Sequence, residues 1–168
     1  MSKSAKRVFC IALVLILVSC IFASLIQTDF GKVQITTVNI VTDSGSTLCG
    51  HLYRPKDATA ENPLPGIVPC HGNYNNKEMQ DVNAIELSRR GYVVLNVDEY
   101  RHGHSSPADF ETWHMTSVDA VDYLYELDFV DQSLIAVTGH SRGAKMANEA
   151  MKENLIRAAA GQPMKLKA

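Results

Sequence analysis

The sequence predicts an α/β domain in which a mostly parallel sheet is flanked by helices, preceded by one apolar N-terminal helix. Between residues 66 and 153, short apolar runs alternate with helical patterns, an order that gives parallel strands joined by right-handed crossovers. The last of these runs is followed directly by a Gly-x-Ser-x-Gly pentapeptide and a helical pattern. Residues 8–26 carry no charge, which sets them apart from the domain.

Composition narrows the classes of function. The chain has 168 residues, which is room for one domain and an anchor, and a formal net charge of -2. Lysine and arginine are spread along the chain without a basic run, so we expect no nucleic-acid partner. Four cysteines at these spacings form neither a disulfide framework nor a zinc site, and we expect no metal and no cofactor. No pattern indicates the oligomeric state.

The apolar segment Val8–Ile26 follows three basic residues, Lys3, Lys6 and Arg7. It is long enough to cross a bilayer, which takes about 20 apolar residues. The positive flank favours a cytoplasmic N-terminus and an exported domain. We therefore expect residues 1–28 to form a single-pass signal-anchor that binds the membrane through Val8–Ile26.

Two alternatives to the signal-anchor stay open. One is a cleaved signal peptide, which would give a secreted protein. The other is a lipid anchor at Cys20, because Leu17-Val18-Ser19-Cys20 has the form of a bacterial lipoprotein cleavage box. All three interpretations place the domain outside the cytoplasm.

The predicted domain spans residues 32–160 and begins with an antiparallel hairpin. Its strands are Val33–Val41 and Thr47–Arg54, joined by the turn-forming residues Asp43–Ser46. A short buried strand, Gly66–Cys70, follows after a polar loop, with its proline near the strand end.

A helix is expected over Asn76–Arg90, capped by Gly91 and followed by a buried strand, Tyr92–Val97. Its predicted buried face consists of Met79, Val82 and Ile85. A second helix is expected over Trp113–Leu127. Its predicted inward residues are Val118, Val121, Leu124 and Tyr125, and its outward acids are Asp119, Asp122 and Glu126.

The polar loop Asp98–Pro107 lies between these elements, at the carboxyl end of a strand. We expect Asp98 and Arg101 to hold the loop by a salt bridge or by backbone hydrogen bonds. His102 and His104 have the His-x-His spacing of a metal pair, but no third ligand stands at a suitable spacing. We therefore expect the loop to be structural.

The apolar run Leu134–Thr138 predicts a strand buried on both faces, and Ala144–Glu153 predicts a helix. Between them lies Gly139-His140-Ser141-Arg142-Gly143. Strand, tight turn and helix form the setting in which this pentapeptide makes a nucleophile elbow, the alternative being a βα turn without chemistry. The glycines remove Cβ atoms where strand and helix approach, and Ser141 stands at the helix N-terminus, where negative charge is favoured.

The loop His71-Gly72-Asn73-Tyr74 follows the Gly66–Cys70 strand. A His-Gly loop at this place supplies a backbone donor to an oxyanion hole. We expect that donor to be the N–H of Asn73, with Tyr74 as the alternative, partnered by the N–H of Arg142. His71 itself is expected to be structural.

These motifs in this order resemble the N-terminal half of an α/β-hydrolase of the dienelactone-hydrolase or serine-esterase/peptidase kind. The run Arg89-Arg90-Gly91-Tyr92-Val93-Val94 leading into Asp98-x-x-Arg101-x-Gly103-x-Ser105 is similar to the family's strand and loop before the elbow. The resemblance covers about Val33–Glu153. It implies an α/β-hydrolase-type sheet and a nucleophile, Ser141, that attacks an ester or amide carbonyl to form an acyl-enzyme.

The family's triad follows the order Ser, then Asp or Glu, then His. After Ser141 the chain has no Asp and no His, and its acids Glu149 and Glu153 lie on the helix that follows the elbow. The sequence thus predicts a chain truncated after that helix, with a short basic tail over 161–168 and an uncovered sheet edge beside the elbow strand. We do not expect any histidine of the chain to replace the missing base; the histidines weighed are His71, His102, His104, His114 and His140.

The motifs and the missing triad members together leave two functions. The first is a membrane-anchored extracytoplasmic serine hydrolase that cleaves carboxylic esters through an acyl-enzyme, with a small-molecule ester or, alternatively, a peptide as substrate. The second is a catalytically inactive remnant or a membrane-tethered binding module. The cap and later loops that shape an acyl pocket are absent, so the substrate is not predicted.

Overall fold

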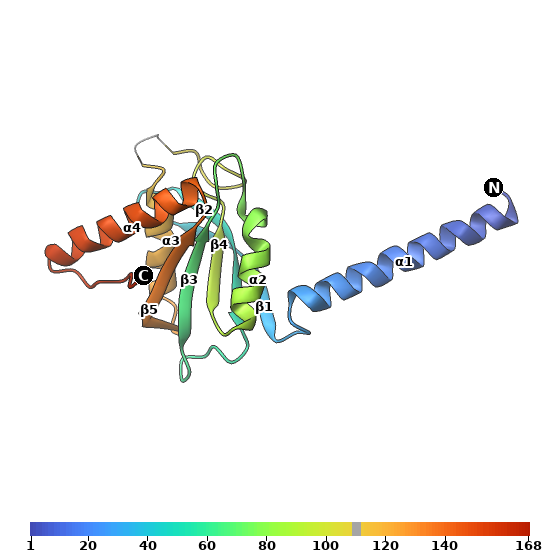
Figure 1. The fold of residues 1–168 in the computed structure, drawn as a ribbon, viewed down its shortest axis with the longest axis horizontal. Helices are drawn as coiled ribbons and strands as arrows, with labels where there is room; N and C mark the ends of the chain where they lie inside the picture. The colour runs from blue at the N-terminus through green and yellow to red at the C-terminus, as the bar shows by residue number, and fades with distance from the viewer. Residues whose placement is uncertain (109–111) are drawn as a thin grey trace.

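The computed structural model describes residues 1–108 and 112–168 and shows one five-stranded sheet with helices on both sides (Figure 1). The strands are β1 (Val33–Val41), β2 (Thr47–Pro55), β3 (Leu64–Cys70), β4 (Val93–Val97) and β5 (Val130–Gly139). The helices are α1 (Lys3–Gln27), α2 (Asp81–Arg89), α3 (Met115–Tyr125) and α4 (Arg142–Ala159), and a 3-10 turn, η1 (Lys77–Gln80), precedes α2.

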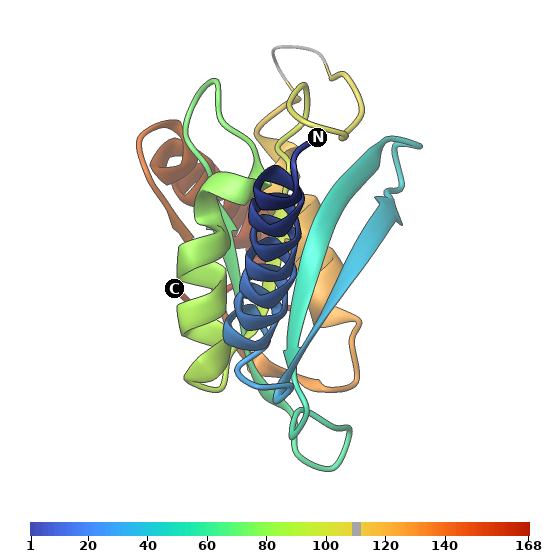
Figure 2. The same ribbon diagram turned by 90° about the vertical axis from the view of Figure 1, so that its right-hand side faces the viewer.

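The strand order is β1-β2-β4-β3-β5. β2 runs antiparallel to β1 and to β4, whereas β3 runs parallel to β4 and to β5. The predicted hairpin and the predicted parallel strands are therefore confirmed, and the hairpin forms the part of the sheet farthest from α4 (Figure 2). The carboxyl ends of β3, β4 and β5 meet at one edge of the sheet.

The core divides into two clusters because successive strand residues point to opposite faces. The larger cluster packs against α3 and α4 and includes Leu95 of β4 with Leu124 and Met146 of the helices. The smaller cluster lies under α2 and includes Val94 of β4 and Ala84 of α2. Figure 1 shows α2 on one side of the parallel strands and α3 and α4 on the other.

Helix α1 extends away from the sheet and has no buried residue (Figure 1). It is long and apolar enough to span a membrane or to be a signal sequence. At its carboxyl end the Arg89 guanidinium of α2 donates a hydrogen bond to the Ile26 carbonyl. Arg89 also lies 3.9 Å from a carboxylate oxygen of Asp29.

The predicted buried face of the helix before β4 is wrong at Met79 and Val82, whereas Ile85 is half-buried and packs against the smaller core cluster. Met79 is 61% exposed and Val82 is 77% exposed, whereas Ala84 and Ser88 are buried. The chain enters the helix through η1, whose 3.0 residues per turn rotate the following residues relative to one continuous α-helix. The buried residues of η1 are Lys77 and Gln80, both polar.

The environment of β5 differs from the prediction in two respects. β5 is not buried on both faces, since Leu134 is 51% exposed. The edge beside it is not fully uncovered, because the C-terminal tail lies along it. The Lys167 N–H donates to the Ile135 carbonyl and the Val137 N–H donates to the Ala168 carbonyl, each at 2.8 Å.

The side chain of Asn154, on α4, makes three hydrogen bonds to this tail. Its Oδ1 accepts the backbone N–H groups of Lys165 and Leu166, and its Nδ2 donates to the Leu166 carbonyl. The Leu166 side chain is 1% exposed. The tail therefore adds apolar surface to the core as well as hydrogen bonds to the edge strand.

Helix α3 presents Val118, Val121 and Leu124 to the core, as predicted. The prediction for Asp119 is wrong, since this residue is half-buried rather than solvated. Its Oδ2 accepts the Tyr100 hydroxyl at 2.7 Å. The periodicity of one helix does not reveal a partner that comes from the loop after β4.

Candidate active site

The turn between β5 and α4 is strained at Ser141. Its φ of 57° and ψ of -117° lie in a region that side-chain-bearing residues rarely adopt. Ser141 is exposed and immediately precedes Arg142, the first residue of α4. The positive end of the helix dipole thus lies beside its hydroxyl.

Two glycines make this turn sterically possible. A Cβ atom on Gly139 would lie 2.2 Å from the carbonyl carbon of Gly143. A Cβ atom on Gly143 would lie 2.2 Å from the Cys70 carbonyl oxygen at the end of β3. Both contacts are with backbone, so neither position admits a side chain without moving a strand or the helix.

The structure brings Asn73 and Arg142 to the wall of one cleft of about 840 Å³, which His102 and Trp113 also line. Within residues 1–108 and 112–168, the backbone N–H groups of Asn73 and Arg142 donate to no protein acceptor. The Arg142 Nη1 donates to the Asn73 Oδ1 at 2.8 Å. The alternative donor Tyr74 has a φ of 60° and is 93% exposed.

His71 is fully buried and links the loops that follow β3 and β4. Its Nε2 accepts the Glu99 N–H at 2.9 Å, so the ring proton resides on Nδ1, which donates to the Gly72 carbonyl at 2.9 Å. Burial lowers the pKa of the imidazole and keeps it neutral. Both ring nitrogens are thus engaged with backbone.

Glu99 is a buried acid that its sequence context does not single out. Its side chain is 1% exposed and its Oε2 lies 3.4 Å from the Nε of Arg142. Among the described residues neither carboxylate oxygen accepts a hydrogen bond. Burial raises the pKa of the Glu99 carboxyl to about 7, against the opposing effect of Arg142.

Arg142 is correspondingly enclosed, with 9% of its side chain exposed. Its guanidinium lies over the ring of Trp113, a favourable cation–π arrangement. One residue therefore carries both a candidate oxyanion donor on its backbone and a buried cation on its side chain.

Asp98 pairs with Lys77, which corrects the predicted salt bridge to Arg101. The Lys77 Nζ lies 2.9 Å from Asp98 Oδ2, with 4% and 0% of the two side chains exposed. The backbone N–H groups of Lys77 and His104 also donate to the carboxylate, as the second part of the prediction anticipated. Burial by itself would raise the pKa of Asp98, but these N–H groups and the ammonium lower it overall.

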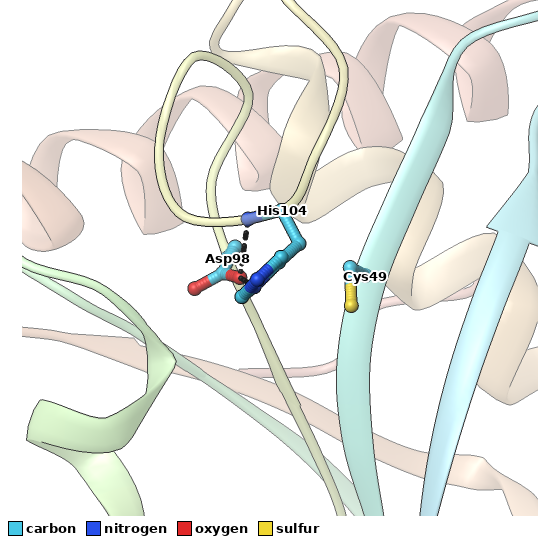
Figure 3. Close-up of side chains that lie close together, drawn as sticks. All are labelled: Cys49, Asp98 and His104. Carbon is cyan, nitrogen blue, oxygen red and sulfur yellow. Dashed lines mark hydrogen bonds and ion pairs between the residues drawn. The ribbon is translucent and has the colours of Figure 1, made fainter.

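His102 and His104 do not converge as a metal pair. The His102 Nδ1 contacts the Tyr100 carbonyl at 3.1 Å, whereas the His104 ring lies near Asp98 and Cys49 (Figure 3). The donor atoms of Cys49, Asp98 and His104 lie within 4.8 Å of one another. However, Asp98 Oδ2 already accepts the Lys77 ammonium, whose charge would repel a cation there. This donor set does not fit a metal ion.

The Ser141 hydroxyl has no hydrogen-bond partner in the described part of the chain. His140 lies beside Gly72, and the His102 Nε2 lies 3.5 Å from the Arg142 Nη1. None of these rings therefore stands as a general base to the serine.

Comparison with known proteins places this geometry in context. No protein-family model matches the chain. A hypothetical protein from Pseudomonas aeruginosa superimposes with a TM-score of 0.64 and 29% identity, over 71% of this chain and 39% of that one. The α/β hydrolase GrgF from Penicillium superimposes with a TM-score of 0.60 and 22% identity, over 70% and 41%. The chain has the α/β-hydrolase fold.

Among curated proteins, the sn-1-specific diacylglycerol lipase ABHD11 of Xenopus tropicalis is 33% identical over 86 residues. This match covers 51% of the present chain and 26% of the lipase. The chain thus spans well under two thirds of each of these three relatives, and its likeness to them is to one part of the fold.

Proposed function

We propose that this chain carries the nucleophile of a membrane-anchored, extracytoplasmic serine hydrolase that cleaves carboxylic esters. The observation that supports this most is the strained turn at Ser141, which two sterically required glycines hold at the start of α4. In α/β-hydrolases, a strained strand-to-helix turn of the form Gly-x-Ser-x-Gly carries the nucleophile, which supports this role for Ser141. A lipase among the relatives favours an ester over a peptide as substrate.

In the proposed reaction, the Ser141 Oγ attacks the ester carbonyl and the alcohol leaves with a proton. The carbonyl oxygen becomes an oxyanion that accepts the N–H groups of Asn73 and Arg142, both without a protein acceptor among the described residues. Water then hydrolyses the acyl-enzyme. We propose that the base and its orienting acid come from segments outside residues 1–168, because no described histidine forms a hydrogen bond with the Ser141 hydroxyl.

Turnover of a p-nitrophenyl butyrate ester by the full-length protein, solubilised from its own membranes, tests this function. The wild type should hydrolyse the ester, and Ser141→Ala should reduce kcat on the order of 10⁴-fold or more. Equal turnover by the two proteins would overturn the proposal. An antibody against residues 134–159 should detect a native band well above 18.5 kDa, the mass of the present chain.

The alternative function is an inactive, membrane-tethered binding module, which the lack of a base near Ser141 favours. It predicts no ester turnover by a folded native protein and the same behaviour for Ser141→Ala. The turnover measurement therefore separates the two functions directly.

The membrane-anchor part of the proposal places residues 1–28 in the bilayer, residues 32–160 in the domain and residues 161–168 in the tail. The fully exposed apolar surface of α1 and its basic N-terminal flank support it. An anchored protein should resist alkaline carbonate extraction and keep its N-terminal residues by mass spectrometry. Loss of those residues would indicate secretion, and an acylated N-terminal Cys20 would indicate a lipid anchor.

A further inference from the structure

We infer that the Arg142 side chain is a positioning residue that sets the separation of the two oxyanion donors. Its guanidinium, held by the buried Glu99 carboxylate, joins the start of α4 to Asn73 on the loop after β3. This inference rests on the proposed function and names a role for a side chain whose backbone N–H is one of the two donors.

The bond between Arg142 and Asn73 joins the start of α4 to a loop residue that lies beyond the close packing of Gly143 against Cys70. Asn73 lies 69 residues before Arg142, and the Nη1 to Oδ1 distance is 2.8 Å. Asn73 is exposed and lies in a turn, outside the strand and helix on either side of it. Fixing its side chain therefore restricts the direction of its own backbone N–H.

Three contacts keep the guanidinium from turning to solvent. Glu99 Oε2 lies 3.4 Å from its Nε, the Trp113 ring covers one face, and the His102 Nε2 lies 3.5 Å from its Nη1. Neither Glu99 oxygen accepts a hydrogen bond among the described residues, so its ion pair with Arg142 is the contact that offsets the burial of the carboxylate. The side chain is thus anchored on one side and donates to Asn73 on the other.

The position of Arg142 and Asn73 matters because an N–H group stabilises the oxyanion only when it points at the place where the charge develops. Removing one donor of this kind costs about 10²–10³ in kcat, and donors must stay within about 0.5 Å of their productive positions. Loss of the Arg142–Asn73 bond leaves both N–H groups present but frees one of them to move. We therefore expect a smaller loss in kcat, on the order of 10–100-fold, with little change in KM because the donors act in the transition state.

The test uses the full-length membrane protein with Arg142→Lys, Asn73→Ala and the double variant. Lysine keeps a positive charge beside Glu99 but lacks the planar fork that reaches Glu99 and Asn73 together. Each single variant should lose about 10–100-fold in kcat with KM within about threefold. The double variant should lose no more than the larger single loss, because both changes break one bond.

Two further variants separate positioning from general damage. Asn73→Gln keeps a neutral acceptor oxygen for the guanidinium and should regain part of the kcat lost in Asn73→Ala. Arg90→Lys, at an exposed arginine that pairs with Glu86, is the matched control and should leave kcat unchanged. Melting temperatures measured on every variant show that the compared proteins are folded.

The outcomes distinguish this inference from the function on which it rests. If the wild type turns over ester and Arg142→Lys stays within threefold of its kcat, or if the two losses multiply in the double variant, the inference is overturned and the function stands. If the folded wild type shows no turnover, the proposed function is overturned and the inference with it.

Discussion

Two segments at the same edge of the sheet are built on different physical principles. The turn between β5 and α4 depends on backbone sterics, since side chains at Gly139 or Gly143 would collide with carbonyl groups. The loop after β4 depends on buried charges, since Asp98 and Glu99 are 0% and 1% exposed and pair with Lys77 and Arg142. The stability of the turn should therefore not depend on pH, but the turn tolerates no added side chain at either glycine. The stability of the loop should depend on the protonation of its acids.

The largest predicted effect is at the turn. Gly143→Ala should destabilise the domain by about 5 kcal/mol or more, or prevent folding, because the added methyl group meets the backbone of Cys70 and His71. Gly161→Ala is the matched control, since Gly161 has a φ of 83° but nothing within 4 Å of a Cβ atom. Urea unfolding should show that Gly161→Ala lowers the free energy of unfolding by only about 1 kcal/mol. Similar losses for both variants would mean that close packing does not define the turn.

The next effect is at the charged loop. Lys77→Met should cost about 3–5 kcal/mol in the free energy of unfolding, because it leaves Asp98 buried without its counter-ion. Adding Asp98→Asn should recover part of this loss, since the uncompensated charge is then removed. A loss below about 1 kcal/mol, the size of an exposed ion pair, would show that the pair is solvated.

A pH-dependent effect is expected at Glu99, whose carboxyl group pairs with Arg142 and interacts with Cys70, and whose backbone N–H donates to His71. Folding raises the pKa of this acid from 4.5 to about 7, so the folded state binds the proton more tightly. Its stabilising contribution is full below pH 4.5 and is lost as the pH rises through 7. Relative to Glu99→Gln, the wild type should lose about 3 kcal/mol of unfolding free energy between pH 4.5 and pH 8.5. A constant difference across this range would contradict the burial of an ionisable Glu99.

The smallest effect concerns the strain at Ser141. Because Ser141 has a φ of 57°, Ser141→Gly should raise the free energy of unfolding by about 1 kcal/mol while removing the hydroxyl. Ser141→Ala, which keeps a Cβ atom, should leave stability nearly unchanged. If both variants have the wild-type stability, the turn is not strained.

The contrast between these two segments also explains which features of the structure can be predicted from the sequence. The hairpin and the parallel strands follow from local periodicity and are found as expected. The fold's resemblance to α/β-hydrolases rests on motifs that are each contiguous in sequence. Local backbone requirements of this kind are visible in a single sequence.

Pairings between distant residues are not visible in the same way. Lys77 stands in a polar stretch where a lysine is ordinarily solvated, and only the structure shows it beside Asp98, 21 residues later. Glu99 follows a buried strand next to another acid, and its pairing with Arg142 depends on the meeting of the loop after β4 with the start of α4. The position of the tail along β5 could not be predicted for the same reason, since it depends on hydrogen bonds between Asn154 and Leu166, 12 residues later.

The central claim is that Ser141 is the nucleophile, and covalent labelling tests it most directly. The full-length membrane protein is treated with a fluorophosphonate probe, digested with trypsin and examined by mass spectrometry. We predict that the probe is attached to Ser141, within the tryptic peptide 102–142, and that Ser141→Ala abolishes labelling while Ser105→Ala does not. A folded native protein that stays unlabelled, or that is labelled at another serine, would contradict it.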